Sequence, residues 1–220
     1  TVDEGKLSGR IDFVPYGMEA EIILIPTSDG VYLVNTFDAG VERSAQETTT
    51  GQPQASITLN MVTGDRLGSA STMEVVNWIR LRVDSGICSI LSGVCKASLN
   101  LAAEYAKIRH QFDRPIATFQ AVSQRAGDAY IDTEAVRLTS RQAAWRIDAG
   151  IPADEKVAIA RWWAAEAGFR VVHAATHLHG GVGVDRDYPL HRFFLMARQL
   201  ELTLGNSEEQ LSFIGDLIAN

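Results

Sequence analysis

The stretch YAKIRHQFDRPIATFQ, residues 105–120, joins two long segments whose apolar residues recur every three or four positions. One apolar stripe covers residues 76–105 and a second covers 122–147. This spacing predicts two amphipathic helices, and Pro115 in the join prevents one continuous helix. The stretch therefore predicts a tight corner between two antiparallel helices, with Thr118 as the N-cap of the second.

Three more helical segments follow this corner. Gly150-Ile151-Pro152 ends the second helix, and the pattern predicts further helices over 153–179, 189–204 and from 207 onward. Long helices that are joined by short turns form an antiparallel bundle. The second part of the chain is therefore expected to be helical.

The segment before residue 71 has a different pattern. It contains short β-prone runs that Gly, Thr, Ser and Asp separate, at residues 9–14, 20–25, 30–34 and 55–60. Ser28-Asp29-Gly30 predicts a hairpin between the second and third runs. We expect an α+β fold, mainly α, with a small antiparallel β-domain over 1–70 followed by an antiparallel helical bundle over 71–220.

Composition restricts the class of function. The 220 residues include 27 acidic and 20 basic ones, giving a formal charge of -7, whereas a general nucleic-acid binder needs a basic surface. Apolar runs such as 22–25 are far shorter than the roughly 20 residues that span a bilayer, and residues 1–5 lack the features of a signal peptide. We expect a cytoplasmic protein with no nucleic-acid or membrane partner.

The two cysteines support the same compartment. Cys88 and Cys95 are seven positions apart within a predicted helix, which separates their Cα atoms by roughly 10 Å. A disulfide needs less than about 7 Å. Two reduced, buried thiols are therefore expected, as in cytosolic proteins.

Two stretches are candidates for ligand binding. Arg109 ends the first long helix beside a turn, where a guanidinium can bind phosphate oxygens in a bidentate manner; for Arg109 alone, an exposed helix-end arginine is the simpler interpretation. The segment 180–183, Gly-Gly-Val-Gly, follows a helix and not a strand, so it does not fit a Rossmann phosphate loop. By itself it is more typical of a helix C-cap.

A metal site is a weaker candidate. His173 and His177 lie four residues apart on one predicted helix, and Glu166 lies two turns earlier, which is a spacing that metal ligands use. No HExxH sequence and no cysteine accompany them. Packed or interfacial histidines are the favoured interpretation, no metal site is predicted, and a helical metal–carboxylate protein has little support.

The stretch 105–120 resembles a pattern of the flavin-dependent acyl-CoA dehydrogenases, Tyr-Ala-x-x-Arg-x-Gln-Phe-Gly-x-Pro-Ile-x-x-Phe-Gln. Asp113 departs from it, because the family usually has Gly there. The segment 177–183, followed by Tyr188-Pro189, is similar to the family's Gln-x-x-Gly-Gly-x-Gly and Tyr-Pro. The resemblance is strong over 93–205 and implies a shortened middle β-domain followed by the family's C-terminal helical bundle.

This resemblance implies a chemistry and a cofactor. The family oxidises an acyl-CoA thioester to the trans-2-enoyl-CoA: a Glu removes the α-proton while the β-hydrogen leaves as hydride to N5 of FAD. In the family's dimers, the ADP end of one subunit's FAD is held by the neighbouring subunit. The resemblance implies that role here for Arg109, Gln111, Phe112, Gln120, His177, Gly180 and Gly181.

Other positions depart from the family pattern. Leu204-Gly205-Asn206 stands where the family has its catalytic Glu-Gly-Thr, and Val83 stands where some members place the Glu instead. Asp84 replaces an Arg. Pro15 replaces a flavin-binding Thr or Ser, which removes both a hydroxyl and a backbone N–H. No catalytic residue is therefore expected in this chain.

The resemblance thus implies the accessory subunit of an α2β2 acyl-CoA dehydrogenase, a type associated with bacterial breakdown of steroid side chains. A catalytic partner chain would supply the Glu, and the acyl-CoA substrate would bind in the complex. The alternative is a non-catalytic scaffold or regulatory binding protein. Retention of Arg109, Gln111 and Gln120 favours the accessory subunit, because a scaffold has no use for a pyrophosphate site.

Overall fold

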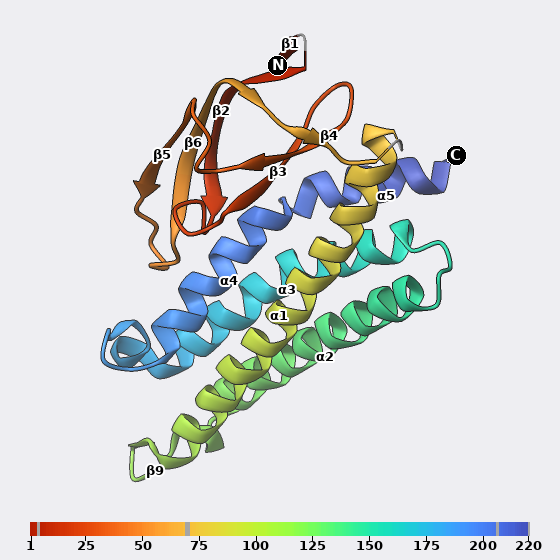
Figure 1. The fold of residues 1–220 in the computed structure, drawn as a ribbon. Helices are drawn as coiled ribbons and strands as arrows, with labels where there is room; N and C mark the ends of the chain where they lie inside the picture. Colours follow the sequence, from red (N-terminus) through yellow and green to blue (C-terminus); the bar gives the residue numbers. More distant parts are fainter. Residues whose placement is uncertain (4, 69–70, 206, 220) are drawn as a thin grey trace. The chain divides into compact units, whose positions relative to one another are not determined.

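A computed structural model describes the whole chain except residues 4, 69–70, 206 and 220. The chain divides into two compact units, Thr1–Arg80 and Leu81–Asn220 (Figure 1). The predicted fold class, α+β and mainly α with small antiparallel sheets before a helical bundle, is confirmed. The predicted boundary at residue 70 lies outside the described residues, so the division into 1–70 and 71–220 stays a prediction.

The first unit contains two antiparallel sheets. The larger has the order β1-β2-β6-β5 and consists of Val2–Asp3, Lys6–Pro15, Gln54–Thr63 and Val41–Gln46. The smaller has the order β3-β4-β7 and consists of Ile22–Pro26, Val31–Asn35 and Asp65–Arg66. Apolar side chains of both sheets share one core, which includes Leu7, Ile25, Val34, Ile57 and Val62.

The hairpin predicted at Ser28-Asp29-Gly30 is confirmed, since β3 and β4 pair on either side of it. The sequence pattern does not predict β5, whose side chains are mostly polar and exposed. As an edge strand, β5 pairs only with β6. Strand pairing and not an apolar face makes it a strand, so hydrophobic periodicity alone could not reveal it.

In the described part of the chain, the helical region contains five α-helices (Figure 1). They are α1 (Thr72–Ile108), α2 (Gln120–Asp148), α3 (Asp154–His179), α4 (Leu190–Leu204) and α5 (Ser207–Ala219). The buried side chains of α3 are mostly alanine, glycine and valine, which allow neighbouring helices to approach closely. A Cβ added at Gly168 of α3 would lie 3.3 Å from Leu91 of α1.

The corner between α1 and α2 is more ordered than a simple turn. His110–Gln111 (β8) and Arg114–Pro115 (β9) form a two-residue hairpin, and its central residues Phe112 and Asp113 have φ values of 53° and 60°. A turn with positive φ at both central positions favours Gly, Asn or Asp. Asp113 can therefore occupy the position at which the resemblance expects Gly.

The prediction of Thr118 as the N-cap of α2 is wrong. The helix begins at Gln120, with Phe119 in the N-cap position. The hydroxyl of Thr118 instead donates to the carbonyl of Pro115, at 2.7 Å, within the short 3-10 helix Ile116–Thr118. The preceding proline and this local hydrogen bond extend the corner by one residue.

Helix α1 is long and apolar enough to cross a membrane, judged by length and composition alone. On these two criteria, the expectation that every apolar segment is too short to span a bilayer does not hold. The core helix of a globular bundle meets the same criteria. Buried side chains of α1 contribute to the bundle core, among them Cys88, Leu91 and Val94.

The thiols of Cys88 and Cys95 are both free and buried, as the sequence predicted. Burial raises the pKa of each thiol to about 12, so both stay protonated near neutral pH. At pH 8 we expect neither thiol to react with a thiol reagent in the folded chain and both to react in denaturant. A colorimetric thiol titration checks this, and rapid reaction of either thiol without denaturant would contradict it.

Candidate functional site

A cavity of about 410 Å³ lies where the end of α1 meets the end of α3. Five of the seven predicted cofactor-binding residues line it: Arg109, Gln111, His177, Gly180 and Gly181. The first two follow or end α1, and the other three belong to the end of α3 and the glycine segment after it. Packing of the two helices therefore brings two distant sequence patterns to one cavity.

The other two predicted residues, Phe112 and Gln120, do not line this cavity. Phe112 is 87% exposed at the hairpin tip, and its ring meets that of Phe119 edge to face at 6.2 Å. Gln120 is the exposed first residue of α2. Both stay on the same corner as Arg109 but outside the cavity.

Backbone hydrogen bonds fix the position of Arg109. Its N–H donates to the carbonyl of Tyr105 at 2.9 Å, and its carbonyl accepts from the N–H of Ile116 at 2.8 Å. The helix end is thereby tied to the far side of the hairpin. No carboxylate in the described part of the chain pairs with Arg109, so its guanidinium remains available to an anion.

A second arginine approaches the cavity from α2. The guanidinium of Arg125 lies 2.5 Å from Nδ1 of His177. Because an arginine can only donate, Nδ1 of His177 is the acceptor in this contact. Arg125 lies outside the two patterns that carry the resemblance, so no sequence signal pointed to it.

His173 does not share a ligand site with His177. Its ring packs at 4.1 Å from that of Phe169 and at 4.8 Å from that of Phe194. Within the described ranges, no three His, Cys, Asp or Glu side chains are grouped so that they could hold a metal ion. The four-residue spacing therefore reflects two separate packing environments.

The glycines of the segment 180–184 have different roles. Gly180 has φ 62° and ψ −138°, a conformation that only glycine adopts readily. A Cβ added at Gly180 or Gly181 would meet no atom within 4 Å, whereas one at Gly183 would lie 2.6 Å from the carbonyl of Thr176. The first two glycines leave the backbone open to the cavity, and the third permits internal packing.

His179 joins the two sides of the cavity, and sequence reasoning did not select it. It is 3% exposed, and its ring stacks on that of Tyr105 from α1 at 4.5 Å. Its Nδ1 lies 2.7 Å from the carbonyl of Ala175, and its Nε2 lies 3.0 Å from the hydroxyl of Tyr188. A neutral ring satisfies both contacts, with Nδ1–H donating and Nε2 accepting.

Leu204, which the sequence resemblance matches to the family's catalytic Glu, belongs to the bundle core. Leu204 is fully buried in that core. Its carbonyl accepts hydrogen bonds from Arg161 and from Nε2 of Gln210, the latter at 3.0 Å. Arg161 in turn forms an ion pair with Asp84 at 3.2 Å. Asn206 lies outside the described residues.

The other aligned positions also lack an acid or base. Val83 is an exposed residue on the surface of α1. Pro15 ends β2, where it is paired with Gln54 of β6. As a proline it offers no N–H to a ligand.

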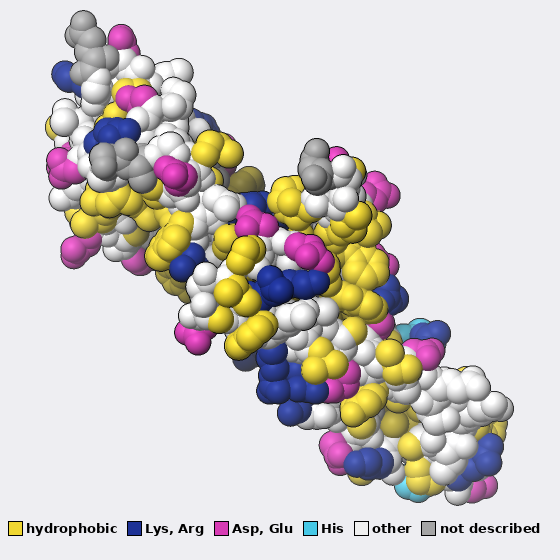
Figure 2. Space-filling model, turned by 90° about the vertical axis from the view of Figure 1, so that its right-hand side faces the viewer, with side chains coloured by type: hydrophobic (Ala, Val, Ile, Leu, Met, Phe, Trp, Pro, Cys, Tyr) yellow, Lys and Arg dark blue, Asp and Glu magenta, His cyan; other side chains and the backbone are white. Residues whose placement is uncertain are grey.

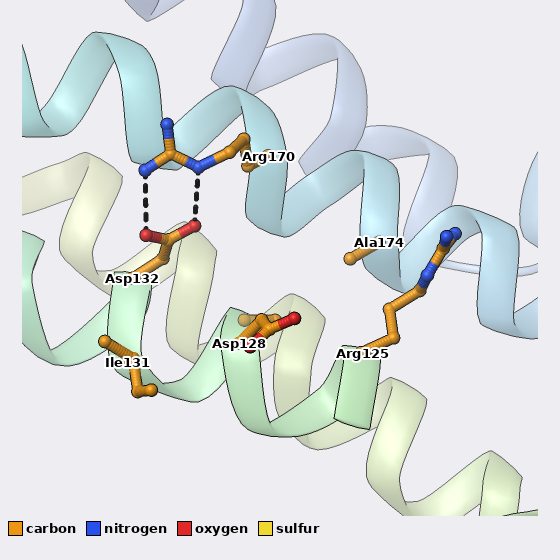
Figure 3. Close-up of a pocket in the computed structure, with 7 residues that line it drawn as sticks. Arg125, Asp128, Ile131, Asp132, Arg170 and Ala174 are labelled. Carbon is orange, nitrogen blue, oxygen red and sulfur yellow. Dashed lines mark hydrogen bonds and ion pairs between the residues drawn. The ribbon is translucent and has the colours of Figure 1, made fainter. Parts of the chain in front are cut away.

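A second cavity, of about 370 Å³, lies between α2 and α3 (Figure 3). Two of its charged side chains are paired with each other: Arg170 donates to both carboxylate oxygens of Asp132 at 2.8 Å and also pairs with Glu166, outside the lining, at 2.8 Å. These bonds raise the pKa of Arg170, chiefly through Asp132. The arrangement is a clamp between two helices.

Burial of His179 predicts a pH dependence. Burial lowers the pKa of His179 below its usual value, so as the pH falls below about 6.5 the unfolded chain binds a proton that the folded chain does not. The free energy of unfolding should therefore fall from pH 7 to pH 5, and less steeply in His179→Gln. Urea unfolding at each pH checks this, with His173→Gln as the control. Equal slopes in the His179→Gln and wild-type chains would contradict it.

Comparisons with known proteins identify the family of this chain. A family model described as "Acyl-CoA dehydrogenase, C-terminal domain" matches residues 68–218. The protein named acyl-CoA dehydrogenase FadE27 of Mycobacterium tuberculosis is 42% identical over 226 residues, which cover 97% of this chain and 61% of that protein.

Solved structures show the same likeness. The crystal structure of the ChsE4-ChsE5 complex from Mycobacterium tuberculosis matches with a TM-score of 0.93 and 42% identity, over 100% of this chain and 62% of the other. The Tcur3481-Tcur3483 steroid ACAD matches with a TM-score of 0.90 and 36% identity, over 99% and 61%. The chain thus spans about three fifths of the length of these relatives. Because the family model matches well over half of the sequence, this chain belongs to the acyl-CoA dehydrogenase family.

Proposed function

We propose that this chain is the accessory subunit of a hetero-oligomeric acyl-CoA dehydrogenase, and that it holds the ADP portion of FAD bound to a catalytic partner chain. The observation that carries this proposal is the single cavity in which Arg109, Gln111, His177, Gly180 and Gly181 meet. These residues come from two separate sequence patterns, and the fold brings both patterns to one cavity.

The residues around the cavity suit a pyrophosphate. The guanidinium of Arg109 and the amide of Gln111 are hydrogen-bond donors, and the backbone at Gly180 and Gly181 is open to close approach. Oriented donors and a cation are what phosphate oxygens need. FAD supplies the redox chemistry when it is bound, while the residues of this chain bind and orient its diphosphate.

No side chain of this chain is proposed as the catalytic base. Leu204 and Val83 occupy the two positions where the family places its Glu, and neither can accept a proton. We therefore propose that a base of the partner chain removes the α-proton of the acyl-CoA. The substrate is proposed to be an acyl-CoA. Because a steroid ACAD is among the similar structures, we propose that its acyl group is a steroid side chain.

An unlike partner also accounts for the exposed apolar surface. Figure 2 shows hydrophobic side chains spread over one face of the molecule, between basic and acidic ones. Large exposed apolar residues of the helical unit include Ile108, Val184, Leu202 and Ile218. We propose that these residues contribute to contacts with other chains. We propose an α2β2 assembly in the cytoplasm, and the likeness to the ChsE4-ChsE5 complex supports a second kind of chain.

A non-catalytic scaffold or regulatory binding protein is the alternative. It would share the fold and the exposed apolar surface, but it would not need the free guanidinium of Arg109. Flavin content separates the two: the purified complex contains flavin under the first proposal and none under the second.

Arg109→Ala should weaken FAD retention by the assembled complex about ten- to a hundred-fold, since a charge-assisted contact is worth roughly 1.5–3 kcal/mol. Arg109→Lys should restore only part of the retention, because a point charge does not reproduce a planar fork. Flavin absorbance per complex after dialysis measures the effect, and dehydrogenase activity should fall with it.

Arg114→Ala is the matched control. Arg114 lies in the same hairpin, but its guanidinium packs over the ring of Phe119 at 4.2 Å and it does not line the cavity. Full flavin occupancy in the Arg109→Ala complex would show that this chain does not hold the ADP portion.

The isolated chain should bind little FAD and show no dehydrogenase turnover, because it offers neither a base nor the hydroxyl and N–H that Pro15 replaces. Adding the partner chain should restore both properties. A dye-reduction assay with an acyl-CoA measures turnover, and activity of the partner-free chain would overturn the accessory role.

A further inference from the structure

Helix α2 buries one regular row of side chains against the rest of the bundle. The buried residues are Ala129, Thr133, Val136, Ser140 and Ala143. Their alternating spacing of four and three residues is that of a helix packed along one seam. The inner face of α2 is therefore fully accounted for by contacts within the chain.

The opposite side of α2 carries a second apolar row, which we call the outer row: Ile131, Leu138 and Trp145. These side chains are 66%, 57% and 59% exposed. A spacing of seven residues places them in line along one face, over roughly 21 Å. Figure 3 shows Asp132 beside Arg170 of α3; Ile131 also borders the cavity between α2 and α3, but most of its side chain is exposed. Nothing in the described part of this chain covers the outer row.

Two opposite charges flank the centre of the outer row on the same side. Glu134 lies four residues before Leu138, and Arg141 lies three residues after it. Glu134 pairs with Arg137 at 2.5 Å. Arg141 is exposed and forms no ion pair with the described residues. The face therefore offers an unpaired cation at one end and a carboxylate at the other.

We propose that the outer row is the contact between two copies of this chain, which pair antiparallel through α2 about a twofold axis at Leu138. In this arrangement Leu138 meets Leu138 of the second copy, and Ile131 meets Trp145 of the second copy. The twofold axis is perpendicular to both helices, so the same flank of each copy lies on the same side of the contact. Glu134 therefore lies beside Arg141 of the second copy.

Charge favours this pairing over the parallel one. A parallel pair brings opposite flanks together, so that Glu134 and Arg141 would lie beside Ala135 and Gln142 of the second copy. The antiparallel pair instead forms two opposite-charge contacts. An isologous contact between identical chains requires a surface that is complementary to itself after a twofold rotation.

The extent of the outer row limits where the pairing occurs. A stable interface buries about 1,200–2,000 Å², and a single helix face offers less. We therefore place the contact inside the assembly that the catalytic partner helps to form, where it joins the two accessory chains of an α2β2 complex. This step rests on the proposed function, and the experiment separates the two.

The experiment uses Leu138→Cys in the purified complex under mild oxidation. Residues at a twofold axis face each other, so a disulfide-linked dimer of this chain should form. The native thiols of Cys88 and Cys95 do not compete, since both are buried. Gln142→Cys is the matched control: it lies one turn away on the same face, and its two copies would be about 12 Å apart along the helix axis, beyond the reach of a disulfide.

Non-reducing electrophoresis and mass spectrometry identify the linked chains. Linkage to the catalytic chain, equal linkage in the Gln142→Cys variant, or no linkage would overturn the pairing. Leu138→Asp gives a second readout: the sedimenting mass should fall by about half, from α2β2 to αβ, while flavin per αβ pair is unchanged. An unchanged mass would also overturn it. If the unsubstituted complex contained no flavin, the proposed function would be contradicted. The disulfide result would still test the pairing of the two copies independently.

Discussion

Close packing around α3 is the constraint on which the rest of the helical unit depends. The buried side of α3 consists mainly of alanine, with Gly168 at the contact with Leu91 of α1. Small side chains let helices approach closely, and a packed interior tolerates little change in volume. Because α1 and α3 are held together along their lengths, their ends are also held together. The cavity is built from those ends, and its geometry therefore follows from the packing of the core.

At the cavity itself, His179 holds the two walls in one arrangement. Its ring is buried between Tyr105 of α1 and Tyr188, which follows the glycine segment. Buried polar groups of this kind are costly unless every hydrogen bond is made, and both ring nitrogens of His179 have a partner. The histidine thus specifies one arrangement of the two walls, while Arg109 remains free to meet a ligand.

The sequence predicted the elements that depend on local pattern and missed those that depend on contacts between distant segments. Periodicity predicted all five long helices, because each has one apolar face. It missed β5, which is defined by pairing with β6, and placed the N-cap of α2 on Thr118 although the corner continues to Phe119. In the cavity, two familiar patterns predicted Arg109 and the glycines. Arg125 and His179 act through contacts that only the folded chain brings together.

The residue that the sequence resemblance matches to the family's catalytic Glu, Leu204, is part of the packing of the bundle. Leu204 fills the bundle core, and its carbonyl is held by Arg161 and Gln210, with Asp84 as the counter-ion of Arg161. An ionised carboxylate placed in such apolar surroundings costs several kcal/mol unless a partner compensates it. The network that could compensate it is already engaged with the end of α4. Packed side chains and an ion pair therefore fill the end of α4, and they leave no room there for an uncompensated carboxylate.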